Sequence, residues 1–300
     1  MIRTAQDRSI RKNLDKYLMI LPFGIMFLIF TVIPVVSAIV LSFTDFNMVQ
    51  TPIWSGLDNY VRMFLDDDVF LIALRNTLIF AVITGPLSYL LCLILGWMVN
   101  EFGRRTRTFL TFIFYLPSIS GSMVTIWSYI LSGDPNGLLN SMLMRLGITD
   151  SAILFMSDTR FILPFLIVVS LWFSLGTSFL SFIAGFQGID RSLYEAGAID
   201  GIRTRFEELR KITLPSMGPQ LMFAAVMQIG ASFAAGGISV QLAGNPSTDY
   251  AGATIVTHLQ DVGTMRYEMG YASAIAVLLF IAMIGTNTGI QKILKRYTDL

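Results

Sequence analysis

Six long stretches without a single Asp, Glu, Lys or Arg constrain this fold more than any other feature of the chain. Crossing the hydrocarbon of a bilayer takes about 20 apolar residues in a helix that rises about 1.5 Å per residue. Each stretch is long enough, and because backbone groups inside lipid must bond to one another, each is predicted to be helical. The stretches are 17–44, 76–100, 108–133, 161–189, 212–248 and 269–291.

The fifth stretch is too long for one span, and turn-forming residues at 216–219 and 243–247 mark its two ends. Composition agrees with a membrane protein: 54% of residues are hydrophobic and 14% are charged, against about 45–50% and about 25% in soluble domains. We therefore predict an all-α membrane protein with one transmembrane domain, residues 17–291. Its six transmembrane helices are predicted at about 17–43, 76–99, 108–131, 161–186, 217–241 and 269–291.

Basic residues set the predicted orientation, because Lys and Arg are enriched on the cytoplasmic side. Sixteen of the 21 Lys and Arg fall in the basic N-terminus 1–16, in 101–107, in 190–211 and in the basic tail 292–300. Both termini are therefore predicted to be cytoplasmic. The first apolar stretch is far longer than the roughly 7–15 residues of a signal-peptide core, so we interpret it as a retained span.

Several chemistries are excluded by residue content. Cys92 and His258 are the single cysteine and histidine, so they cannot form a metal site of His and Cys ligands, and no metal site is predicted. We place His258 in an outer loop, where it offers no base for a serine nucleophile. No lysine follows a glycine or precedes Ser or Thr, so the chain lacks a phosphate-binding P-loop.

Two outer loops, 45–75 and 134–160, mix apolar and polar residues and are predicted to form short helices on the membrane surface. Asp66, Asp67 and Asp68 are interpreted as a helix start rather than a cation site, because acidic residues favour helix N-termini. Loops of this size can receive a partner protein but are too small to be a separate catalytic domain.

A polar segment, YEAGAIDGIRTRFEELRKITLPSMGP from Tyr194, separates two apolar stretches. Asp190 or Ser192 can cap a short helix before it. Gly201 allows a sharp turn, since glycine tolerates positive φ. A second helix is predicted over 204–211, ended by Pro215 before the fifth span.

This segment resembles the cytoplasmic EAA loop of ABC-importer permeases, in the residues Glu195-Ala196-Gly197, Asp200-Gly201 and Ile212-Thr213-Leu214-Pro215. The usual pattern has Ala at position 197 and one residue fewer between Gly201 and Ile212. Flanking motifs are similar to those of carbohydrate-uptake permeases of the maltose and glycerol-phosphate importer type. They are SFTD at 42–45, GLDNY at 56–60, LRNT at 74–77, LP at 116–117 and GLLN at 137–140.

The resemblance implies a type I ABC-importer permease fold and a transport subunit, not an enzyme, in a bacterial inner membrane. It implies that a separate ATPase dimer holds ATP and Mg, that this chain binds no cofactor, and that residues 190–215 couple the two. The other implied partners are a second homologous permease, an extracytoplasmic solute-binding protein, a carbohydrate and the lipid bilayer, with no nucleic acid. The implied coupling residues are Glu195, Ala196, Gly197, Asp200, Gly201, Ile212, Leu214 and Pro215.

Polar residues within the spans predict a solute pathway, because polar groups at membrane depth face a cavity or a partner helix. Gln228 and Ser232 lie one helical turn apart in the fifth span, with Phe233 beside them, and Trp172 lies near the middle of the fourth. We interpret these four as cavity residues; helix–helix hydrogen bonding and core packing are the alternative.

Other functions stay open. An importer for a polyamine, phosphate or peptide would share the polar segment but not the flanking motifs. An intramembrane enzyme such as a lipid-linked glycosyltransferase would need acidic residues at a lipid-access groove. A scaffold protein would give no reason for the spacing of residues 195–215.

Overall fold

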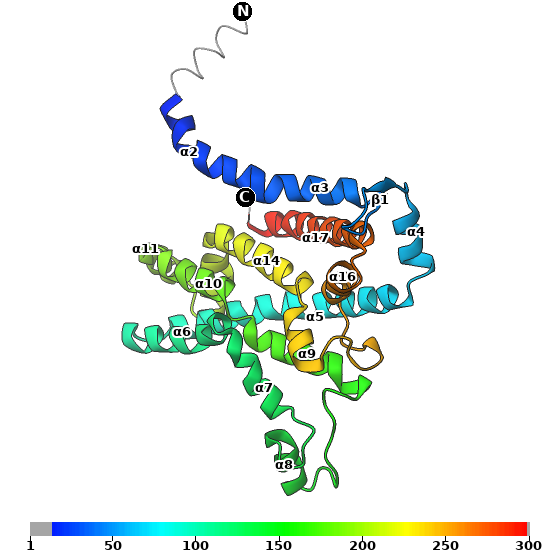
Figure 1. Cartoon of the computed structure of the whole chain (residues 1–300). Helices are drawn as coiled ribbons and strands as arrows, with labels where there is room; N and C mark the ends of the chain where they lie inside the picture. Colours follow the sequence, from blue (N-terminus) through cyan, green and yellow to red (C-terminus); the bar gives the residue numbers. More distant parts are fainter. Residues whose placement is uncertain (1–13, 299–300) are drawn as a thin grey trace, which may run out of the picture. The chain divides into compact units, whose positions relative to one another are not determined.

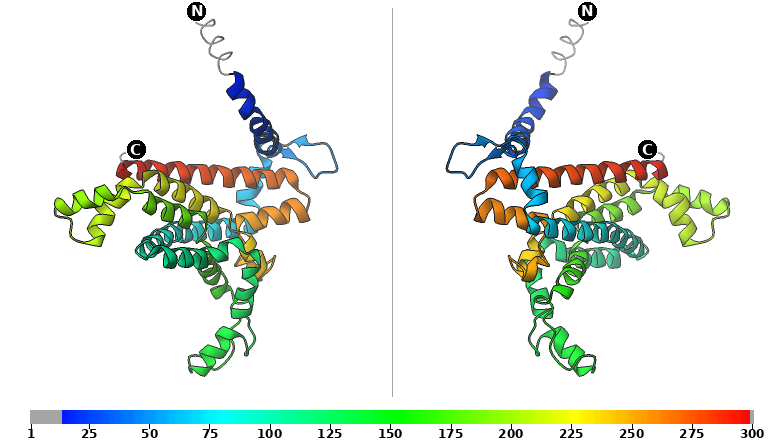
Figure 2. Two further views of the ribbon diagram at one scale, coloured as in Figure 1. Left: turned by 90° about the vertical axis from the view of Figure 1, so that its left-hand side faces the viewer. Right: turned by 90° about the vertical axis from the view of Figure 1, so that its right-hand side faces the viewer.

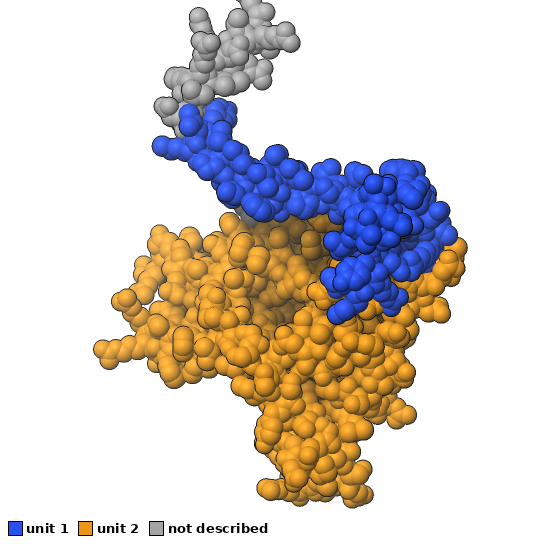
Figure 3. Space-filling model, viewed as in Figure 1, with its two compact units in different colours: residues 1–62, 262–277 blue, residues 63–261, 278–300 orange. Residues whose placement is uncertain are grey.

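The structure, a computed structural model, describes residues 14–298 and is built mainly from helices. The chain divides into two compact units, 1–62 with 262–277 (unit 1) and 63–261 with 278–300 (unit 2), coloured blue and orange in Figure 3. Three elements cross the sequence boundaries of the units: α4 (Asp58–Leu65), η5 (Asp261–Met265) and α17 (Met269–Thr298). Of the predicted basic ends, residues 1–13 and 299–300 lie outside the described part of the chain.

Unit 1 begins with a long helical segment, Lys16–Leu41, that is apolar enough to cross a membrane. A short antiparallel hairpin follows, with Thr44 opposite Trp54. Asn59 fixes the approach to this hairpin, because its Nδ2 donates to the carbonyls of Ser42 and Thr44 at 3.0 and 2.9 Å. The elements before α4 are α2 (Leu14–Phe27), the π-helical turn η1 (Leu28–Val32), α3 (Ile33–Leu41), β1 (Thr44–Asp45) and β2 (Ile53–Trp54).

Unit 2 contains most of the helices. They are α5 (Asp68–Asn100), α6 (Arg104–Ile119), η2 (Gly121–Met123), α7 (Val124–Ile130), α8 (Leu138–Arg145), α9 (Thr159–Phe173), α10 (Thr177–Gly188), α11 (Arg191–Ile199), α12 (Arg205–Glu208), the π-helical turn η3 (Leu209–Thr213), α13 (Leu214–Ser216), α14 (Gly218–Phe233), α15 (Gly237–Ala243), η4 (Thr248–Tyr250) and α16 (Ile255–Gln260).

The centre of unit 2 is the group α5, α10 and α14, which lie side by side (Figure 1). Phe179, Phe182 and Met217 are fully buried between them. Gly96 allows α10 to approach α5, since a Cβ there would lie 3.3 Å from the Cβ of Phe182. Small residues at such contacts let membrane helices pack closely, and close van der Waals packing helps to hold helices together in lipid.

Within residues 14–298, four helices are long and apolar enough to cross a membrane, and six segments qualify if each bent helix pair is one span. The bent pairs are Arg104–Ile119 with Gly121–Ile130, at 80°, and Gly218–Phe233 with Gly237–Ala243, at 41°. The prediction of one unbroken helix over 108–131 and over 217–241 is therefore wrong. The first break has an extended residue, Ser120, and the second contains Gly236, which tolerates non-helical backbone.

Two prolines each lie two residues after the end of a π-helical turn. Pro34 follows η1 and Pro215 follows η3. Proline lacks an N–H, and its ring crowds the carbonyl four residues earlier, which here lies inside the widened turn. Helical backbone therefore continues through both prolines. The prediction that Pro215 ends the second helix of the polar segment is wrong, because α13 runs to Ser216.

The two predicted outer loops contain short helices, α4 and α8, as expected. Asp67 caps α5, since its Oδ1 accepts from the N–H of Phe70 at 2.8 Å, which confirms the helix-start interpretation. His258 differs from expectation: it is buried in α16, with its Nε2 3.0 Å from Oδ2 of Asp67. Asn76 also connects α5 to a distant segment of unit 2, because its Nδ2 donates to three carbonyls of residues 250–253 at 3.0 to 3.2 Å.

Candidate functional site

Residues 190–216 form a helical hairpin that projects from unit 2, as both views in Figure 2 show. Its first arm, α11, begins at Asp190, whose Oδ1 accepts from the N–H of Ser192 at 3.0 Å. This confirms the predicted cap, and the same hydrogen bond lowers the pKa of Asp190. The chain then turns at Gly201 with φ at +88°, as predicted for a residue without a Cβ.

The second arm has a reciprocal cap of its own. Oγ1 of Thr204 accepts from the N–H of Glu207 at 3.2 Å, and Oε2 of Glu207 accepts from the N–H of Thr204 at 3.3 Å. Oε2 of Glu207 also accepts from the N–H of Arg203 at 3.1 Å. These backbone donors lower the pKa of Glu207. Hydrogen bonds between residues close in sequence therefore fix where the second arm begins.

The two arms are held together by Gly197 and Ile212. Gly197 is buried, and a Cβ placed on it would lie 2.5 Å from Cδ1 of Ile212 and 3.2 Å from Cδ1 of Ile202. The hydroxyls of Tyr194 and Thr213 form a hydrogen bond of 2.9 Å between the arms. The small size of Gly197 thus serves a contact inside this chain.

The outer surface of the hairpin combines charge with exposed apolar side chains. Glu195 is exposed, as are Ala196, Asp200, Gly201 and Pro215. Ile199 is 87% exposed, Phe206 is 66% exposed and Leu193 is 46% exposed. Exposed apolar side chains rimmed by polar groups mark interaction sites. Sequence reasoning identified Glu195 but missed Ile199, because periodicity alone does not show which face of a short helix lacks a neighbour.

Arg205 connects the hairpin to the turn between α5 and α6. Its Nη1 lies 2.8 Å from Oε2 of Glu208, and its Nη2 lies 3.5 Å from Oε2 of Glu101. At the base of the hairpin, Leu214 packs against the buried cluster of α5, α10 and α14. Leu214 and Arg205 therefore connect the hairpin to the helix core and to the end of α5.

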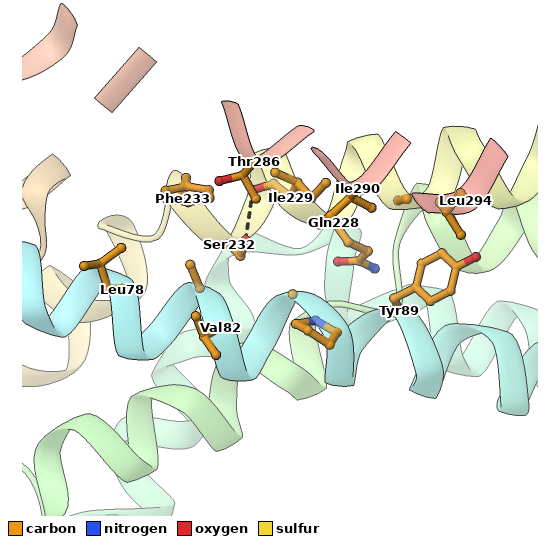
Figure 4. A pocket seen from close by; sticks show the side chains of 14 residues that line it. Leu78, Val82, Tyr89, Gln228, Ile229, Ser232, Phe233, Thr286, Ile290 and Leu294 are labelled. Atoms are coloured by element: carbon orange, nitrogen blue, oxygen red, sulfur yellow. Dashed lines mark hydrogen bonds between the residues drawn. The ribbon is translucent and has the colours of Figure 1, made fainter. Parts of the chain in front are cut away.

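Gln228 and Ser232, the predicted pathway pair, are both buried and line two cavities in unit 2. The larger, about 410 Å³, is mostly apolar and also takes in Phe233 (Figure 4). The smaller, about 260 Å³, adds polar groups, including the hydroxyl of Ser170, which is buried without a hydrogen-bond partner. Nε2 of Gln228 donates to the carbonyl of Ser174 at 3.2 Å.

Trp172 lies elsewhere and lines neither of these cavities. Its ring packs edge-to-face against Trp127 and Phe173, with centroids 5.7 and 5.0 Å apart. The structure therefore brings three of the four predicted pathway residues together and places the fourth in an aromatic cluster. Within the described residues, no three His, Cys, Asp or Glu side chains gather where they could hold a metal ion.

Residues 88–297 match the family described as the binding-protein-dependent transport system inner membrane component. The chain belongs to this family. It is 34% identical to the probable ABC transporter permease protein YesP of Bacillus subtilis, over 92% of this chain and 89% of YesP. It is 28% identical to the arabinooligosaccharides transport system permease protein AraP of the same species, over 93% of this chain and 88% of AraP.

The fold is shared with a solved structure of a bacterial ABC transporter involved in the import of the acidic polysaccharide alginate. The TM-score is 0.80 at 24% identity, over 98% of this chain and 99% of that one. Membership of the transport family makes this chain a multi-pass inner-membrane permease subunit rather than an enzyme, and together with its relatives it confirms the resemblance of the chain to carbohydrate-uptake ABC permeases.

Proposed function

We propose that this permease is the membrane subunit of an ATP-driven importer that carries an oligosaccharide across the inner membrane. AraP, which matches along most of its length, is named for arabinooligosaccharide transport. Gln228 and Ser232 supply an amide and a hydroxyl to buried cavities, and such groups suit a hydroxylated solute. Phe233 adds an aromatic face, and Trp172 supports the adjoining helices through its ring contacts.

One observation carries the coupling part of the proposal: residues 190–216 project from unit 2, and Leu193, Ile199, Phe206 and Glu195 on this hairpin are all exposed. An ATPase subunit covers these side chains, and Glu195 pairs with a basic residue of that subunit. The ATPase dimer holds ATP and Mg. Gly197 and Ile212 give the hairpin its internal packing, so that it moves as one body, and Leu214 packs its base against the cluster of α5, α10 and α14.

The transport cycle is alternating access. With six spans and both termini in the cytoplasm, the hairpin lies on the cytoplasmic side, and the outer loops receive a solute-binding protein that delivers the sugar. A second, homologous permease completes the pathway. ATP closes the ATPase dimer, the hairpin follows, and the bundle changes from inward-open to outward-open; hydrolysis resets it. An importer for a polyamine, phosphate or peptide is the alternative.

Affinity purification of the tagged full-length protein from its native host in mild detergent tests this proposal. The expected result is recovery of a second permease, an ATPase and a solute-binding protein, identified by mass spectrometry. The binding protein is then screened against oligosaccharides, polyamines, phosphate and peptides, and saccharide binding is expected. Recovery of the chain without an ATPase contradicts the importer, and binding of a non-sugar solute alone supports the alternative.

A further inference from the structure

A groove in unit 2 between α6 and α10 differs from the cavities around Gln228, and we propose that it binds the carboxylate-bearing part of the transported solute. The groove has a volume of about 590 Å³, within the range of ligand sites of about 300–1,000 Å³. This inference rests on the proposed function and deepens it, because it makes the solute an acidic oligosaccharide. The lining residues are Arg104, Arg107, Thr108, Thr111, Phe112, Tyr115, Ile183 and Gln187.

The charge of the groove is positive at one end. Arg104 and Arg107 form no ion pair with a carboxylate of residues 16–295. Nη1 of Arg107 donates to Oδ1 of Asn100 at 2.8 Å, which orients the guanidinium and leaves its other N–H groups for a ligand. Glu101 and Glu208, which line a second cavity together with Arg104 and Arg107, are both held by Arg205. Two guanidinium groups in one groove favour a carboxylate, which arginine binds with two parallel hydrogen bonds.

The wall beyond the arginines carries hydroxyl and amide groups among apolar side chains, and these polar groups favour a sugar acid over a lipid. Residues 104, 107/108, 111 and 115 follow the i, i+3/i+4 spacing of one helix face, over about 17 Å. This face presents the hydroxyls of Thr108, Thr111 and Tyr115, and Oγ1 of Thr111 is buried without a partner. A phospholipid bound by its headgroup needs an apolar wall for its acyl chains, whereas a saccharide needs hydroxyl partners.

Two further side chains suit a sugar ring. Gln187 on α10 faces the groove and brings an amide that both donates and accepts hydrogen bonds. Phe112 and Tyr115 bring aromatic rings that can pack against the C–H face of a pyranose. Carboxylate, hydroxyl and ring-face partners thus occur in one groove, and a uronate-containing oligosaccharide is the solute class that uses all three.

Uptake in the native host, with the full importer present, tests the inference. The chain's gene is deleted and replaced by wild type, by Arg104→Gln with Arg107→Gln, by Arg107→Lys, or by Arg105→Gln. Arg105 is the matched control, because it is a neighbouring exposed arginine that does not line the groove. The probes are radiolabelled trimers of galacturonate, mannuronate and glucuronate, each beside its carboxyl-reduced, neutral counterpart. Membrane levels of every variant are measured by immunoblot.

The expected result is chain-dependent uptake of a uronate trimer that exceeds uptake of its neutral counterpart. We expect the double glutamine variant to lower this uptake at least tenfold, Arg105→Gln to leave it unchanged, and Arg107→Lys to retain more of it than the double variant. Uptake of neutral trimers alone, or uronate uptake insensitive to Arg104 and Arg107, overturns the inference and leaves the proposed function standing. Loss of an anionic phospholipid from the purified double variant at unchanged uptake also overturns it. If no saccharide uptake depends on the chain, the proposed function itself fails.

Discussion

A substitution at Gly197 tests how the hairpin 190–216 is held together. A Cβ at this position lies 2.5 Å from Cδ1 of Ile212, a separation that side chains do not tolerate, and 3.2 Å from Cδ1 of Ile202. Both contacting atoms are the ends of flexible side chains, so the loss of stability depends on the size of the side chain placed at position 197. Gly197→Ala adds one methyl group, and Gly197→Val adds two more at a contact that is already too short.

The two variants should differ in stability. For alanine, moving the Ile212 methyl about 30° from its rotamer costs about 0.5–1.5 kcal/mol. Replacing a helical glycine by alanine stabilises the helix by about 1 kcal/mol, so the strain and the gain in helix propensity nearly cancel. For valine, overpacking costs about 1–3 kcal/mol and the gain in helix propensity is smaller. The net cost is about 0.5–2.5 kcal/mol, so we expect Gly197→Val to raise the opening equilibrium of the hairpin roughly 2- to 60-fold.

Hydrogen–deuterium exchange of the purified protein, followed in peptides from 191–216, measures this opening. Gly197→Val should exchange faster throughout these peptides, while peptides from α5 stay unchanged. Ile212→Ala combined with Gly197→Val should restore protection relative to Gly197→Val alone, since it removes the colliding methyl groups. Wild-type exchange in Gly197→Val, or no restoration in the double variant, would refute the packing argument.

Three further predictions follow from other contacts. Asn76→Ala removes the amide that donates to three carbonyls of residues 250–253, so it should cost about 1–3 kcal/mol and lower the melting temperature in detergent. An unchanged melting temperature would contradict a stabilising role for these hydrogen bonds. The folded pKa values of Asp190 and Glu207 are lowered, so both stabilise the hairpin fully above their unfolded pKa values and lose this effect as pH falls through the folded ones. Exchange protection of 191–208 should therefore fall below about pH 4, and Asp190→Asn with Glu207→Gln should abolish that pH dependence. Gln228→Ala removes the amide 3.3 Å from the sulfur of buried Cys92, so maleimide labelling of Cys92 should speed up, and equal labelling rates would contradict this shielding.

Much of the fold follows from the absence of charge over long stretches, since lipid requires the backbone in them to bond internally. Helix breaks were not predicted. Ser120 and Gly236 lie in apolar stretches that look continuous, and composition does not show where a helix bends. The opposite error was made at Pro215, where a helix end was predicted but the helix continues. Proline usually breaks a helix, but here the π-helical turn before it accommodates the ring.

The hairpin was the more predictable site, because its caps and turn depend on neighbours in sequence. Asp190 and Gly201 act within a few residues, so their roles could be inferred from the residues alone. Contacts between distant residues could not. The sequence does not indicate that His258 pairs with Asp67, which lies 191 positions away. It also does not indicate that Trp172 packs against Trp127 instead of lining a cavity.

The proposed function requires that a separate ATPase bind the exposed surface of residues 190–216. The most direct test is the amount of ATPase recovered per permease from Glu195→Lys, with Asp150→Lys as a control of equal charge change on another exposed acidic residue. Both variants should reach wild-type levels in the membrane. We expect Glu195→Lys to lose most of the ATPase while Asp150→Lys retains it. Wild-type recovery with Glu195→Lys would contradict the assignment of this surface.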